Sequence, residues 1–85
     1  GQSPAEQRET LAFVKSFLTA KLERNLARED VEVAQAAAKK LEDLGNPQLA
    51  AEAYRDFGRL LAKSKDEAVA DAARQMQAAA TRLQP

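Results

Sequence analysis

Two acidic side chains, Glu52 and Asp56, stand four residues apart and share one face if their segment is helical. Carboxylates at this spacing are candidates for acid–base catalysis or for binding a metal through oxygen. A metal site would need further converging ligands, and a Glu-x-x-His pattern is impossible because the chain has no His. Since Asp and Glu are rarely buried without a partner, we interpret the two residues as part of a solvated face.

Basic side chains also recur at helical spacing and could receive a carboxylate or a phosphate. The alternative is that they pair with nearby carboxylates or keep the surface soluble, as exposed helical side chains commonly do. We prefer this alternative, and we keep Arg55 and Arg59 as candidate interaction residues. The two rows are Arg55, Arg59 and Lys63, and a looser one of Lys21, Arg24 and Arg28.

Composition argues against several classes of function. The absence of His and Cys removes the commonest general base, the commonest metal ligand and any thiol chemistry. Basic and acidic residues are equal in number, so no net charge favours nucleic acid. No apolar run approaches the roughly 20 residues of a membrane span. We therefore expect no catalysis by this chain, no cofactor, no metal, no nucleic-acid partner and no membrane span.

Four aromatic residues could line a ligand pocket or a peptide groove. In a chain with so few large side chains, they more simply form the core. If Phe13 and Phe17 cannot both be covered, however, an exposed apolar patch remains, and such patches mark protein partners or self-association. The aromatic residues considered are Phe13, Phe17, Tyr54 and Phe57.

Strong helix formers dominate and β-branched residues are scarce, which predicts an all-α fold. Ser3, Pro4 and Glu6 have the spacing of a capping box, and Ser64 to Glu67 repeats it. We expect one domain with helices at residues 4–24, 29–44, 47–62 and 65–83. In the second helix the apolar residues at 33, 34, 37, 38, 41 and 44 should face inward.

The segment Gly45-Asn46-Pro47 predicts an abrupt change of direction. Gly45 can end a helix in the left-handed conformation, Asn46 can cap the next helix, and Pro47 fits its first turn. Such a short connection makes its two helices antiparallel neighbours. We expect a four-helix antiparallel bundle of αα-hairpins, with the third helix central because its apolar face is the richest.

The hairpin "GNPQLAAEAYRDFGRLL" partly resembles a tetratricopeptide repeat, through the spacing of Gly45, Ala50 and Tyr54. Phe57 stands where that family has a small residue, Ala34 where it has a bulky aromatic, and Ala62 where it has proline. This resemblance implies a tetratricopeptide-like helix pair in the middle of the chain. It also implies an alternative function, peptide binding, in which the third helix would be only half covered.

The segment from Leu41 to Leu83, about half of the chain, resembles the helical region that precedes the thioredoxin-like domain of secreted TlpA-type redoxins. The resemblance implies a periplasmic or secreted protein in which a thiol–disulfide oxidoreductase domain follows this module. The family's Cys-x-x-Cys motif has no counterpart here, so no redox residue can be transferred. The sequence therefore leads to a non-catalytic helical interaction or positioning module, with homodimerisation as an alternative.

Overall fold

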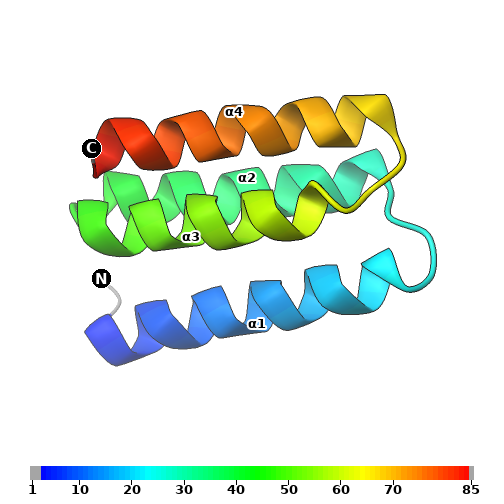
Figure 1. Ribbon diagram of the computed structural model, residues 1–85. Coiled ribbons are helices and arrows are strands. Elements are labelled where there is room, and N and C mark those ends of the chain that lie inside the picture. Colours follow the sequence, from blue (N-terminus) through cyan, green and yellow to red (C-terminus); the bar gives the residue numbers. More distant parts are fainter. Residues whose placement is uncertain (1–2, 85) are drawn as a thin grey trace.

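The computed structural model describes residues 3–84, which form four α-helices and no strand. The helices are α1 (Pro4–Leu22), α2 (Arg28–Asp43), α3 (Pro47–Leu61) and α4 (Glu67–Leu83). They run in alternating directions along nearly parallel axes (Figure 1). The predicted all-α class and the four helices are confirmed. Observed and expected ends differ by no more than two residues, within the ordinary fraying of helix ends.

The capping residues set two of the helix starts. At α1 the predicted capping box is present: the Glu6 amide donates to Ser3 Oγ at 3.2 Å, and the Ser3 amide donates to Glu6 Oε1 at 3.1 Å. The second predicted box is wrong. Asp66 caps α4 instead, because its carboxylate accepts from the amides of Ala68 and Val69, while Ser64 Oγ accepts from the Asp66 amide.

The connection between α2 and α3 has the predicted geometry. Gly45 adopts φ +80°, the left-handed region that favours glycine. Its amide donates to Glu42 O at 3.0 Å, and the Asn46 amide donates to Leu41 O at 3.2 Å, the two bonds of a Schellman motif. Asn46 Oδ1 then accepts from the Leu49 amide at 3.2 Å, and Pro47 begins α3. The end of α2 and the start of α3 are thus both capped within three residues.

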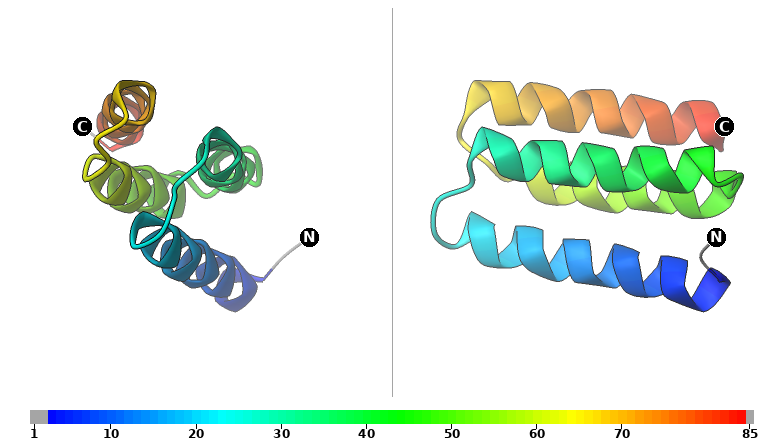
Figure 2. Two further views of the ribbon diagram at one scale, coloured as in Figure 1. Left: turned by 90° about the vertical axis from the view of Figure 1, so that its right-hand side faces the viewer. Right: turned by 180° about the vertical axis from the view of Figure 1, so that it is seen from behind.

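Helix α3 contacts each of the other three helices, as its rich apolar face predicts. Helix α1 contacts α2 and α3, and α4 also contacts α2 and α3, but α1 and α4 do not contact each other. The end view shows α1 and α4 on opposite sides of the α2–α3 pair (Figure 2). One flank of α1 therefore has no helix beside it within residues 3–84.

The core gathers along α3, where Phe57 and Leu61 are fully buried together with small residues that let neighbouring helices approach. At Gly58 an added Cβ would lie 3.1 Å from the carbonyl oxygen of Ala73, so α3 and α4 are packed closely there. The predicted inner face of α2 needs one correction. Val31 is buried, whereas Val33 and Leu44 are 45% and 40% exposed.

Candidate interaction surface

Phe13 is the most exposed large apolar side chain among the described residues, with 72% of its surface accessible. The expectation that it belongs to the core is wrong. Leu11, Val14 and Leu18 form the buried stripe of α1, and Phe13 falls on the flank of that stripe. Phe17, one turn later, is partly buried and packs against the core. The two phenyl rings thus continue the core outward to the surface.

The side of α2 that is turned toward α1 also carries apolar residues. Val33, Ala37 and Leu44 recur at intervals of four and seven residues, so they share one helix face. That face lies toward α1, because Asp30, three residues before Val33, pairs with Lys21 of α1 at 3.8 Å. We call this area the Phe13 surface. It comprises Phe13, Phe17, Val33, Ala37 and Leu44.

Tyr54 lies inside the molecule rather than on this surface. It is 8% exposed, and its hydroxyl donates to Glu42 Oε1 at 3.3 Å. Glu42 also pairs with Arg82 at 3.4 Å, so a network of three polar side chains links α3, α2 and α4. Burial raises the pKa of Tyr54 above its ordinary 10.0, and the charge and hydrogen bond of Glu42 raise it further. Together with the complete burial of Phe57, this places both α3 aromatics in the core.

The carboxylates Glu52 and Asp56 do not form a converging acidic site. Arg8 of α1 pairs with Glu52 at 3.1 Å, and Lys15 of α1 pairs with Asp56 at 3.2 Å. Both carboxylates are largely covered, so they are interhelical pairs and not a freely solvated face. They fasten the flank of α1 that faces α3, which is the flank opposite Phe13.

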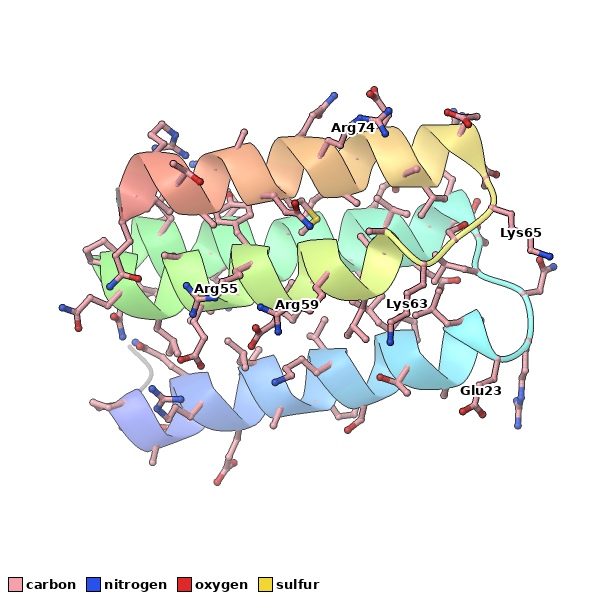
Figure 3. All side chains as sticks on the ribbon, in the orientation of Figure 1. Glu23, Arg55, Arg59, Lys63, Lys65 and Arg74 are labelled. Carbon is pink, nitrogen blue, oxygen red and sulfur yellow. The ribbon has the colours of Figure 1, made fainter. Side chains whose placement is uncertain are left out.

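The basic row of α3 lies along one side of that helix, as the labelled residues in Figure 3 show. Arg59 makes a long pair with Asp56, at 3.9 Å. Arg55 makes no ion pair or hydrogen bond within residues 3–84, and both guanidinium groups border a shallow polar hollow between α3 and α4. The structure therefore does not bring Arg55 and Arg59 together with Phe13 and Phe17. The five candidate interaction residues thus lie in three places: two on α1, one in the core and two on the outer side of α3.

The described residues contain no group of three or more His, Cys, Asp or Glu positioned to hold a metal ion. Nor is any described helix both long enough and apolar enough to cross a membrane. Val33 and Leu44 were missed as surface residues because the thin alanine face of α2 left its inner direction ambiguous. Because Val31 is buried, the inner face of α2 is rotated relative to the face that the sequence predicts.

Comparison with known proteins gives no further guide to identity: no family model, curated protein or solved structure matches the chain.

Proposed function

We propose that this chain is a helical interaction module that binds a protein partner through the Phe13 surface. The observation that carries the proposal is the 72% exposure of Phe13, with Phe17 one turn later on α1. Exposed Val33 and Leu44 lie on the side of α2 that is turned toward α1. Scattered single apolar residues are normal on a protein surface, but adjoining ones mark interaction sites. Aromatic residues are also enriched at the energetic centres of interfaces.

The resemblance to TlpA-type redoxins supplies the proposed context. In that context the module belongs to an exported protein, periplasmic or secreted, and is followed by a thioredoxin-like domain that performs the thiol chemistry. The module itself positions and associates; it does not catalyse. The finer architectural description, a bundle of αα-hairpins with a tetratricopeptide-like pair of α2 and α3, is part of the same proposal.

The buried state of Tyr54 and Phe57 argues against the alternative of a tetratricopeptide-like peptide groove on α3. That alternative needs α3 to be half covered, so that aromatic side chains can reach a bound peptide. Tyr54 and Phe57 are 8% and 0% exposed, and α3 has a neighbour on three sides. The Phe13 surface on α1 and α2 is the better candidate for contact with a partner.

A photo-crosslinking amino acid placed at position 13 in cells that produce the protein naturally tests this function. The matched control is the same amino acid at Ala78, an exposed residue of α4, the helix that does not contact α1. We expect a discrete adduct from position 13 and none from position 78. Equal, diffuse labelling at both positions, or no adduct at either, would show that the Phe13 surface has no partner.

A further inference from the structure

One ridge of α1 has a charge pattern that is complementary to itself when reversed. Glu9, Phe13, Phe17 and Lys21 follow one another at intervals of four residues, so their side chains form one inclined ridge, each about 40° further around the helix than the last. The order along this row is acid, aromatic, aromatic, base. Read from the other end, the same row presents base, aromatic, aromatic, acid.

We propose that the partner of the Phe13 surface is a second copy of this chain, docked with its α1 antiparallel to α1 of the first. This inference rests on the proposed function and names its partner. In the paired ridges, each Phe13 lies against Phe17 of the other copy, and each Glu9 lies against Lys21 of the other copy. The contact is isologous, because the same row serves both copies, and a two-fold axis closes it.

The residues of the ridge are available for this contact. Glu9 is exposed and makes no hydrogen bond or ion pair within residues 3–84. Lys21 Nζ lies 5.8 Å above the ring of Phe17, and its 3.8 Å pair with Asp30 leaves 41% of its side chain exposed. The opposite flank of α1 is already engaged through Arg8 and Lys15, so α1 is held with the Glu9–Phe13 half of the ridge outward. The other half is partly exposed, because Phe17 also packs against the core.

Opposite charges at both ends of the ridge favour the antiparallel arrangement over the parallel one. In a parallel pair, Glu9 would face Glu9 and Lys21 would face Lys21, and like charges across an interface are unfavourable. The exposed apolar residues Val33 and Leu44 on the α1 side of α2 widen the area beside the ridge. Since one helix face and this border are small compared with a standard interface, we expect a weak, concentration-dependent dimer.

Sedimentation equilibrium over a concentration series tests the dimer. We expect the mass to rise from 9.3 kDa toward twice that value. Phe13→Ala and Glu9→Lys should each weaken dimerisation about tenfold or more, because one removes the central ring and the other places two like-charged pairs in each dimer. Glu67→Lys, the same charge change on α4, is the matched control and should leave the dimer unchanged.

Single cysteines test the orientation, since the natural chain contains none. Glu9→Cys and Lys21→Cys variants, mixed and mildly oxidised, should form a mixed disulfide. Each variant alone should oxidise slowly, because equivalent positions at the ends of antiparallel helices lie about 18 Å apart for twelve residues of helix. Rapid homodisulfide formation by Glu9→Cys alone would overturn the antiparallel arrangement.

The outcomes separate the two proposals. A chain that stays at 9.3 kDa at every concentration, or a dimer unaffected by Phe13→Ala, overturns the second-copy inference. If crosslinking at position 13 then captures a different protein, the proposed interaction function stands without the dimer. If crosslinking at position 13 also yields no discrete adduct, both proposals fail.

Discussion

At the scale of single residues, Glu42 connects parts of the fold that are distant in sequence. One of its carboxylate oxygens accepts a hydrogen bond from the Tyr54 hydroxyl, and the other pairs with Arg82. A tyrosine at this depth needs such a partner, because an unpaired buried hydroxyl costs about 1–3 kcal/mol. Burial and, after it, the contact with Glu42 raise the pKa of Tyr54, so the hydroxyl keeps its proton to a higher pH in the folded protein.

We predict that Tyr54 titrates above pH 10.0 in the folded chain and that Glu42→Gln shifts its midpoint downward. Burial and the negative Glu42 raise the pKa of Tyr54, and the substitution removes the charge while keeping an acceptor oxygen. Phenolate absorbance reports this residue alone, because the chain has one Tyr and no Trp. A midpoint at or below the ordinary value in the folded protein would contradict the buried contact.

The raised pKa also fixes the sign of a stability change. The unfolded chain loses the Tyr54 proton before the folded chain does, so this contribution is complete below pH 10.0 and is lost as pH rises through the folded pKa. Tyr54→Phe lacks the titration. Above pH 10.0 the natural chain should therefore lose unfolding free energy relative to the Tyr54→Phe variant. Urea titrations of both proteins at several pH values measure this loss.

Phe13 and Phe57 provide a matched pair of one residue type in opposite environments. Phe57→Ala should lower the free energy of unfolding by about 3–5 kcal/mol, because it leaves a cavity where a fully buried ring packed. Phe13→Ala should change it by less than about 0.5 kcal/mol, as most surface substitutions do. Urea unfolding at low protein concentration compares them. Equal losses would mean that Phe13 belongs to the core.

At the scale of the elements, the connection between α2 and α3 holds more than two helix ends. Asn46 Oδ1 caps α3, while Asn46 Nδ2 donates to Gln7 Oε1 of α1 at 2.7 Å. A single side chain therefore joins the turn to the first part of a third helix. Gln7 is buried there, and no buried side-chain nitrogen or oxygen within residues 3–84 lacks a hydrogen-bond partner.

Substitutions in this connection should destabilise the fold in two ways, through lost hydrogen bonds at Asn46 and through backbone strain at Gly45. Asn46→Ala should destabilise the fold by about 1–2 kcal/mol, since the cap is lost and the Gln7 contact with it. Gly45→Ala should cost about 1–2 kcal/mol through the left-handed backbone alone, because no atom lies within 4 Å of the added Cβ. Gly45→Asn should cost less, as Asn tolerates this conformation. Thermal unfolding followed by circular dichroism ranks the three.

The sequence predicts the local features of these elements well and their rotation less well. Ser3, Gly45, Asn46 and Pro47 act through their immediate neighbours, so their roles could be recognised from spacing. The direction in which α2 faces depends on how its alanines pack against α1 and α3. In the structure Val31 is buried and Val33 is exposed. Small side chains give little energetic preference for one rotation over another.

The candidate surface likewise has a part that the sequence predicts and a part that depends on tertiary packing. The sequence identifies Phe13 and Phe17 as large apolar residues and leaves two outcomes open: burial in the core, or an exposed patch if the thin alanine faces do not cover both. Which ring is exposed depends on the packing of α1, with Arg8 and Lys15 pulling the other flank toward α3. Those pairs join residues more than 40 positions apart, so no local spacing could reveal them.

At the scale of the whole molecule, the contact pattern divides the helices by how firmly they are held. Helix α3 has neighbours on three sides and supplies the fully buried Phe57 and Leu61. Helix α1 is held by α2 and α3 alone, and three ion pairs with exposed or partly exposed basic side chains join it to them. Exposed ion pairs contribute little, typically below about 1 kcal/mol each.

Native-state hydrogen exchange should therefore show α1 opening at lower free energy than α3. Amides of Leu11 and Val14 should exchange through local opening, whereas those of Ala53 and Phe57 should exchange only when the whole chain unfolds, because segments with less buried contact open first. Phe13→Ala is the background for the measurement, since a dimer through α1 would itself protect that helix. Raising the concentration of the natural chain should then increase protection in α1 and leave α3 unchanged. Equal opening free energies for α1 and α3 in Phe13→Ala would instead mean that the four helices unfold as one cooperative unit.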